Sequence, residues 1–239
     1  MWGLPDSADG AREFGLRVVD AVGGRVGVVK PQVAFFERHG SAGYRALEDV
    51  LAAGRAAGLV VIADAKRGDV GSTVDAYGEA WLTPGAPLEA DAVTVVAYQG
   101  LGSLNGVITR AEAAGKGLFV LAATSNPESA VTQRAVRGDG RTVAAGVVAD
   151  VRDRRSDALG LVVGATLDLA EVGVLTDDLA GIPVLAPGFG AQGAVLSDLD
   201  RMFGAAAVHT LANVSRSVLG AGPDGLVDAV DRANGEVGA

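Results

Sequence analysis

Short apolar runs that alternate with longer stretches of helical periodicity constrain the fold of this chain more than any other feature. Each run holds β-branched residues and is apolar on both faces. Such runs, separated by helices, are typical of a parallel sheet whose two faces are covered. The seven predicted strands are residues 25–29, 59–63, 92–96, 118–122, 159–163, 182–186 and 206–211.

Helical periodicity fills segments between these strands and continues beyond both ends of the series. A closed (β/α)8 barrel uses eight strands, whereas an open doubly wound sheet can use seven. No Pro/Ser-rich linker or charge block divides the 239 residues, so residues 1–239 are expected to form one domain. The predicted helices are residues 6–22, 44–57, 72–81, 104–114, 143–155, 193–203 and 224–234.

Composition argues against several classes of protein. The formal net charge of −9 disfavours a nucleic-acid surface, which needs basic patches that replace counterions. The absence of cysteine excludes disulfides and thiolate chemistry and favours a reducing, cytoplasmic location. Two histidines, His39 and His209, without a Cys/His cluster argue against a zinc site. No apolar run reaches the length of a membrane span, and no secretory signal is expected.

Distinctive polar residues follow several predicted strands. Lys30 follows the first strand, and Asp64 and Lys66 follow the second. In α/β barrels the carboxyl ends of the strands form the active-site face. We therefore expect the chemistry of this chain at that end of the sheet.

The most distinctive motif is Asp-Ala-Lys-Arg-Gly-Asp at 64–69, directly after a predicted strand. Because side chains alternate along a strand, Asp64 and Lys66 should project from the same face. A charged pair is costly to bury under a helix layer, so the barrel mouth is favoured, with Asp69 on the loop beyond it. Adjacent strands lie about 5 Å apart, so Lys30 can reach Asp64. The alternative is an ordinary solvated turn beside a lone exposed lysine.

Two later motifs have the character of a phosphate site. The sequence at 187–193 contains Gly-x-Gly-x-x-Gly between a predicted strand and helix, where backbone N–H groups can approach a phosphate. NAD binding is disfavoured because no acidic residue occurs near position 213, where a ribose-binding carboxylate is expected. Arg216 follows the last strand, and its guanidinium suits a phosphate. The alternatives are that residues 187–193 form a tight turn without a ligand and that Arg216 is an exposed arginine without a function.

The motif Thr-Ser-Asn-Pro at 124–127 indicates first of all a helix start. Asn126 stands at the cap, and a proline takes the first helical position. Ser125, one step earlier at a strand end, can additionally face a ligand.

Taken together and in this order, the motifs resemble those of the orotidine 5'-monophosphate decarboxylases. The resemblance rests on Val-Val-Lys-Pro-Gln, Phe-Phe-Glu, Asp-Ala-Lys-Arg-Gly-Asp, Thr-Ser-Asn-Pro, Pro-Gly-Phe-Gly-Ala-Gln-Gly and Asn-Val-Ser-Arg-Ser. It covers essentially the whole chain and implies a TIM (β/α)8-type barrel. It also implies conversion of orotidine 5'-phosphate to UMP and carbon dioxide, the last step of de novo pyrimidine synthesis, without metal or organic cofactor.

The resemblance implies a charged network of four catalytic residues. Lys30, Asp64, Lys66 and Asp69 would form this network, and Lys66 would deliver a proton to C6 of the pyrimidine. The enzyme would be a homodimer, in which Asp69 and Thr73 are contributed to the site of the neighbouring subunit.

The resemblance also implies residues that bind the substrate. Ser125 would hydrogen-bond the pyrimidine ring. Gln192 and Arg216 would bind the phosphate, and Pro187 would line the pocket.

One departure from the family pattern concerns the first strand. Family members begin with a strand that ends in a Gly-Ile-Asp-Pro-like sequence, whose aspartate contacts the ribose. Residues 1–4 resemble the segment just after that strand, so seven strands are expected, with open edges beside the Lys30 strand. Truncation or a misassigned start would explain this. A version extended upstream is expected to be more stable and much more active.

Two other functions stay open at this point. Related barrels that decarboxylate or condense keto-sugar phosphates share an Asp-x-Lys-x-x-Asp strand end but use a divalent metal, so metal dependence would favour them. An inactive, dimeric phosphate-binding protein is conceivable because a strand is missing. Such a protein would bind nucleotide without a fall in orotate absorbance.

Overall fold

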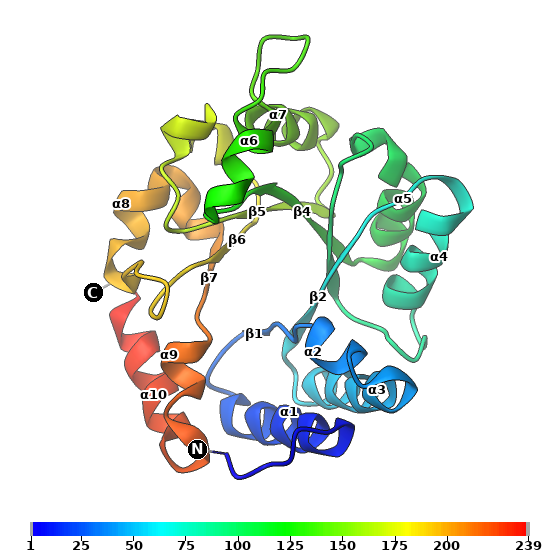
Figure 1. The fold of residues 1–239 in the computed structure, drawn as a ribbon, viewed down its shortest axis with the longest axis vertical. Helices are drawn as coiled ribbons and strands as arrows, with labels where there is room; N and C mark the ends of the chain where they lie inside the picture. The colour runs from blue at the N-terminus through cyan, green and yellow to red at the C-terminus, as the bar shows by residue number, and fades with distance from the viewer. Residues whose placement is uncertain (1, 238–239) are drawn as a thin grey trace.

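The computed structural model describes residues 2–237. Seven parallel strands pair in sequence order into one sheet, which curls into an incomplete barrel surrounded by helices (Figure 1). The predicted strand number and barrel class are confirmed. The strands are β1 (Val28–Val29), β2 (Val60–Arg67), β3 (Ala92–Val95), β4 (Gly117–Ala123), β5 (Leu159–Val163), β6 (Val184–Pro187) and β7 (Thr210–Asn213).

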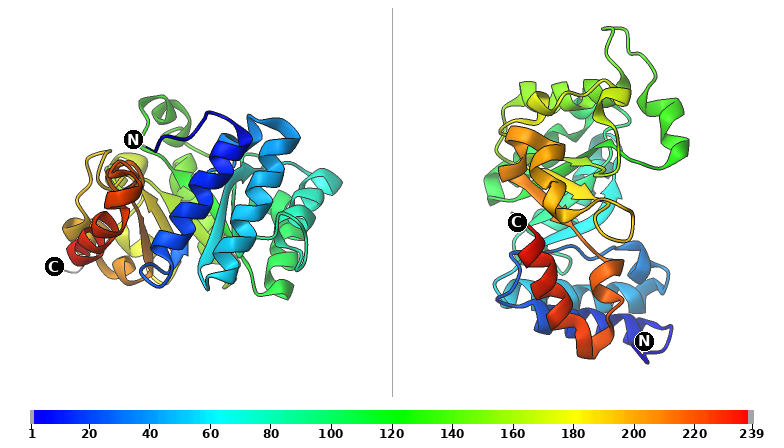
Figure 2. Two further views of the ribbon diagram at one scale, coloured as in Figure 1. Left: turned by 90° about the horizontal axis from the view of Figure 1, so that it is seen from below. Right: turned by 90° about the vertical axis from the view of Figure 1, so that its left-hand side faces the viewer.

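Helices form an outer layer around the strands (Figure 2). Within the described part of the chain, none is both long and apolar enough to cross a membrane. The α-helices are α1 (Ala8–Val22), α2 (Ala34–Glu37), α3 (Gly40–Ala56), α4 (Gly71–Leu82), α5 (Asn105–Ala114), α6 (Ala130–Gln133), α7 (Val143–Arg154), α8 (Leu199–Phe203), α9 (Arg216–Leu219) and α10 (Gly222–Glu236). The 3-10 helices are Leu101–Leu104, Pro127–Ser129, Leu169–Val172, Thr176–Leu179, Leu196–Asp198 and Gly204–His209.

Apolar side chains are buried on both faces of the sheet, as the doubly apolar strands require. The larger cluster joins strands to helices and includes Leu47 of α3 and Trp81 of α4. Side chains that converge from successive strands fill the interior of a barrel. A smaller cluster takes one residue from each of five consecutive strands, β2 to β6: Ile62, Ala92, Phe119, Val162 and Leu185.

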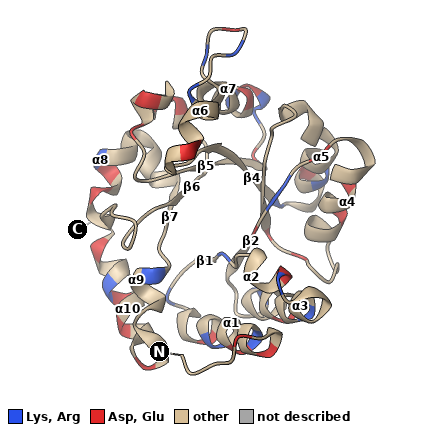
Figure 3. Ribbon diagram, in the orientation of Figure 1, with Lys and Arg blue, Asp and Glu red and all other residues tan. Residues whose placement is uncertain are grey.

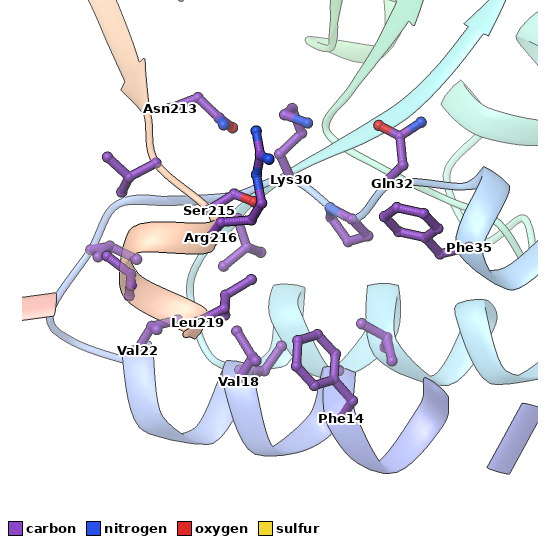
Figure 4. Close-up of a pocket in the computed structure, with 18 of the residues that line it drawn as sticks. Phe14, Val18, Val22, Lys30, Gln32, Phe35, Asn213, Ser215, Arg216 and Leu219 are labelled. Atoms are coloured by element: carbon purple, nitrogen blue, oxygen red, sulfur yellow. The ribbon is translucent and has the colours of Figure 1, made fainter. Parts of the chain in front are cut away.

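The sheet is open on the side between its edge strands, β1 and β7. A groove of about 1250 Å³ lies there, lined by residues of α1, β1, β7 and α10. Figure 4 shows apolar side chains of α1, among them Phe14 and Val18, beneath it. The open edges match the expectation from the sequence. The gain in stability and turnover expected from an added upstream strand stays a prediction.

The predicted strand at 206–211 is wrong in its first part. Gly204–His209 forms a 3-10 helix, and β7 begins only at Thr210. The first two residues of the predicted strand, Ala206 and Ala207, lack the β-branched side chains that favour a strand. Thr210 Oγ1 also donates to the Ala206 carbonyl over 2.9 Å, which holds the turn before the strand.

The predicted helix at 193–203 is wrong over its first residues. Gly193 has φ of 109°, outside the range of a right-handed helix. Its N–H donates to the Gly190 carbonyl over 2.9 Å within a tight turn. A 3-10 turn follows, and α8 begins only at Leu199.

Candidate active site

A cavity of about 360 Å³ opens at the carboxyl ends of the strands. Apolar side chains from β4, β5 and β6 line it, namely Leu121, Val162 and Leu185. Val162 and Leu185 also belong to the cluster that fills the barrel interior. The cavity therefore lies directly against the interior core, and its chemistry comes from the polar residues of its walls.

A group of three charged residues lines one wall of the cavity. Lys30 follows β1, whereas Asp64 and Lys66 lie within β2, which continues to Arg67 and so past its predicted end. Nζ of Lys30 lies 2.7 Å from Oδ2 of Asp64, and Nζ of Lys66 lies 2.5 Å from Oδ1. One carboxylate thus bridges two ammonium groups. Figure 3 marks basic residues along the chain at the ends of β1 and β2.

Asp64 carries its charge in a buried position, with 7% of its surface exposed. Burial on its own would raise the pKa of Asp64, because it disfavours the charged form. Lys30 and Lys66 outweigh burial and hold the pKa below its ordinary value. The Lys66 side chain is 44% exposed and that of Lys30 is 15% exposed, so Lys66 has the freer ammonium group.

Backbone pairing between the first two strands continues past Lys30 and fixes the contact with Asp64. The N–H of Asp64 donates to the Pro31 carbonyl over 3.0 Å, and the N–H of Val33 donates to the Asp64 carbonyl over 3.3 Å. The side chain of Gln32 donates to the same carbonyl over 3.3 Å. Lys30 is therefore held at its place beside Asp64 by the main chain on both sides.

The backbone of β2 is irregular at Lys66, whose φ of 48° lies in the left-handed region that non-glycine residues rarely adopt. Ala63 pairs with Val93 but Arg67 pairs with Val95, so β2 bulges between them. Simple strand alternation therefore does not describe this stretch, although Asp64 and Lys66 both reach the cavity.

Thr94 is a cavity residue that sequence reasoning does not single out. It lies in β3 opposite the bulge and lines the cavity beside the charged group. The signal that could have found it is a lone polar residue in an otherwise apolar strand, Ala-Val-Thr-Val.

The residues predicted to bind phosphate come from the segments after β6 and β7. Gln192, from the loop after β6, and Arg216, at the start of α9, both line the cavity. Gly190 has φ of 72°, and a Cβ atom there would lie 2.3 Å from Oγ of Ser217. Glycine thus lets the 187–193 loop pack against the turn that carries Arg216. Figure 4 shows Arg216 close to Lys30 at the top of the groove.

The remaining predicted residues divide into two sets. Pro187 lines the cavity, at the end of β6. Asp69, Thr73 and Ser125 are not among the described residues that line it. Asp69 is half-buried just after β2, Thr73 is exposed in the first turn of α4, and Ser125 is exposed after β4.

The end of β2 is anchored from outside the cavity by a small polar network. Arg67 donates to Glu37 over 2.9 Å and to the hydroxyl of Tyr44 over 3.2 Å. Tyr44 donates to Glu37 over 2.7 Å, and this hydrogen bond, with that of Arg67, holds the pKa of Glu37 below its ordinary value. The network fixes the backbone two residues before Asp69.

Comparison with known proteins places this chain in a family. Residues 11–229 match the model of the orotidine 5'-phosphate decarboxylase / HUMPS family. A Streptomyces coelicolor protein named orotidine 5'-phosphate decarboxylase is 50% identical over 240 residues, which cover 97% of this chain and 84% of that protein. A Corynebacterium glutamicum protein of the same name is 44% identical, and the match covers 93% of this chain and 82% of that protein.

Solved structures agree with this assignment. A crystal structure from Streptomyces avermitilis, assigned as an orotidine 5'-phosphate decarboxylase, superposes with a TM-score of 0.92 at 48% identity and covers 99% of this chain and 84% of that one. The OMP decarboxylase of Leishmania donovani gives a TM-score of 0.80 at 32% identity, covering 96% and 88%. The resemblance read from the sequence motifs is thereby confirmed, and the chain belongs to the orotidine 5'-phosphate decarboxylase / HUMPS family.

Proposed function

We propose that this chain decarboxylates orotidine 5'-phosphate to UMP and carbon dioxide, a reaction of pyrimidine biosynthesis, in one domain spanning residues 1–239 and without a cofactor. The observation that carries the proposal is the Lys30–Asp64–Lys66 group, which lines the same cavity as Arg216. A relative that is 50% identical carries the name of this enzyme. A cytoplasmic location stays a prediction from the cysteine-free composition.

Lys66 is the proposed proton donor. Loss of carbon dioxide leaves an electron pair on C6, a ring carbon without an adjacent electron sink, so the barrier is very large. Enzymes commonly lower barriers by about 8–23 kcal/mol. An ammonium group fixed beside C6 stabilises the charge that develops in the transition state. The C6–carboxylate bond breaks, Lys66 protonates C6, and the neutral lysine then takes a proton from water.

Asp64 has two proposed roles. It fixes the two ammonium groups through the contacts of 2.7 and 2.5 Å. Its carboxylate would also repel the substrate carboxylate, by about 4 kcal/mol at ~4 Å and an effective dielectric constant near 20. The departure of neutral carbon dioxide relieves this repulsion, so the carboxylate favours the transition state over the bound substrate.

Gln192 and Arg216 are proposed to bind the phosphate. The guanidinium of Arg216 suits phosphate oxygens, and the amide of Gln192 can add a hydrogen bond. Ser125 is proposed to hydrogen-bond the pyrimidine ring, and Pro187 to pack beside it. Contacts with a group remote from C6 supply binding energy that orients the ring for reaction.

The partner that we propose is a second copy of this chain. Asp69, on the loop before α4, and Thr73, in the first turn of α4, lie outside the described lining of their own cavity. Val70 and Tyr98 are large apolar residues exposed on the nearby loops after β2 and β3. Exposed apolar surface of this kind is typical of interfaces. A homodimer would cover it and bring Asp69 and Thr73 to the neighbouring site.

The experiment follows the absorbance of the orotate ring with orotidine 5'-phosphate and a chelator. The chain should turn over, and Lys66→Ala should lose turnover by at least about 10³-fold, because a general acid and a fixed charge are removed together. Lys116→Ala is the matched control. Lys116 pairs with Glu89 just before β4, at the opposite end of the barrel. It should keep turnover within about threefold at temperatures where it is folded.

Other outcomes would support the alternative functions. Turnover that is lost in chelator and restored by a divalent metal would favour a keto-sugar-phosphate enzyme, a function that the names of the relatives do not favour. Nucleotide binding without any change in absorbance would favour an inactive phosphate-binding protein.

A further inference from the structure

Thr94 is buried beside the charged group and is only 1% exposed. Burial of a hydroxyl is costly unless its hydrogen-bonding capacity is used. The hydroxyl of Thr94 both accepts and donates a hydrogen bond. The backbone N–H of Lys66 donates to Thr94 Oγ1 over 2.9 Å, and Thr94 Oγ1 donates to Oδ1 of Asp64 over 2.9 Å.

The direction of these two hydrogen bonds is fixed by chemistry. A backbone N–H can only donate, so Oγ1 accepts from Lys66 and turns its single proton towards Asp64. Oδ1 of Asp64 also accepts from Nζ of Lys66. The contacts therefore form a closed ring, in which Thr94 and Asp64 connect the backbone of Lys66 to the end of its own side chain.

The bulge explains why this ring exists. Residues 64–66 lie opposite Thr94, between the paired positions Ala63 and Arg67. The N–H of Lys66 is met by the threonine hydroxyl rather than by a carbonyl of β3. That hydrogen bond supports the left-handed φ of 48° at Lys66, which an ordinary strand would not impose. Because threonine is branched at Cβ, its rotamer is restricted and its hydroxyl is already oriented.

We infer that Thr94 is a positioning residue whose hydroxyl holds the bulged backbone of Lys66 and the carboxylate of Asp64, and so aims the Lys66 ammonium into the cavity. The inference rests on the proposed function of this site. Thr94 acts on the reaction through Lys66 and Asp64, so its loss should lower kcat more than it changes KM.

The test compares Thr94→Val, Thr94→Ser and Thr94→Ala with the unchanged chain. Valine keeps the shape but lacks the hydroxyl, and it should lower kcat about 30- to 100-fold, because small displacements of a reacting group are costly. KM should stay within about threefold. Serine should keep at least about a third of kcat, since it retains both hydrogen bonds. Thr210→Val is the matched control on β7, where a hydroxyl donates to Ala206, and it should change kcat less than about twofold.

The serine and alanine variants differ only in the hydroxyl, so their comparison tests the role of the hydroxyl even if the valine variant does not fold. A kcat for Thr94→Ala within about threefold of Thr94→Ser would overturn the inference. So would an effect confined to KM. A crystal structure of Thr94→Ala gives a readout that does not depend on turnover. Lys66 should leave the left-handed region and lose its contact with Asp64, and unchanged geometry there would overturn the inference even if the chain had another activity.

Discussion

Nζ of Lys30 lies 2.7 Å from Oδ2 of Asp64, although 34 positions separate the two residues in the chain. The contact joins the residue that follows β1 to a residue within the adjacent strand β2. It uses the carboxylate oxygen that Lys66 leaves free. Strand order therefore assembles the charged group, and each oxygen of Asp64 holds one lysine.

Asp64→Asn should lower kcat by about 10³-fold, because both ammonium groups lose the carboxylate that fixes them. Steady-state turnover of orotidine 5'-phosphate measures the effect. Asp91→Asn is the control, since Asp91 accepts from the N–H of Val61 near the opposite end of β2. It should affect stability but leave kcat of the folded protein nearly unchanged. Equal losses in the two variants would argue against a specific role for Asp64.

Arg216→Ala should raise KM by about 10²-fold, because an arginine–phosphate contact is charge-assisted and partly desolvated. Arg201→Ala is the matched control. Its side chain is 74% exposed and pairs with Asp198, away from the described cavity lining. Titration of substrate with both variants measures the effect. An unchanged KM in Arg216→Ala would show that this residue does not bind the phosphate.

Mixing Lys66→Ala with Asp69→Ala should restore activity that neither variant has alone. In a hybrid homodimer one site receives both changes, while the other receives an intact Lys66 and an intact Asp69. Random reassortment makes half of the dimers hybrids, so about a quarter of the original activity should return. The measurement is turnover after refolding the mixture. Activity that stays at the level of the two separate variants would contradict a shared site.

Glu89→Gln should lower the free energy of unfolding at pH 7 by about 2 kcal/mol, because it removes the charge that pairs with buried Lys116. The hydrogen bond from Lys116, with those from Gly85 and Arg55, lowers the pKa of Glu89 to about 2. An unfolded glutamate titrates near pH 4.3. Because its pKa is lowered on folding, ionised Glu89 contributes its full stabilisation at pH values above about 4.3. This stabilisation is lost as the pH falls towards 2.

Urea unfolding at pH 7, 5 and 3 checks this prediction. The difference between Glu89→Gln and the unchanged chain should shrink at the lowest pH. Glu79→Gln is the control, because Glu79 is exposed and pairs with Arg110. It should change stability by less than about 0.5 kcal/mol. A difference for Glu89→Gln that does not vary with pH would exclude an electrostatic origin.

Much of the fold could be predicted because its signals are local. Doubly apolar runs such as 159–163 coincide with a strand of the sheet, Leu159–Val163. The helix predicted at 143–155 matches Val143–Arg154 to within one residue. The wall formed by Lys30, Asp64 and Lys66 could also be predicted, since parallel strands bring their carboxyl ends to one face.

What could not be predicted depends on contacts between strands. The left-handed backbone of Lys66 arises from a bulge against β3, and one strand read alone gives no sign of it. The sequence marks Thr94 only as a polar residue in an apolar strand, and its hydrogen bond to the bulged backbone is not visible there. The 3-10 helix Gly204–His209 is a similar case, because Ala206 and Ala207 are apolar and buried as strand residues would be, so hydrophobicity alone does not separate this turn from a strand.

The open side of the sheet has a kinetic consequence for the charged group. Among the strands of residues 2–237, β1 pairs with β2 alone, so its amides are expected to exchange with deuterium sooner than those of the central strands. Each local opening of that strand separates Lys30 from its carboxylate while the rest of the barrel stays folded. The fraction of molecules in which Lys30 contacts Asp64 then depends on how often β1 opens.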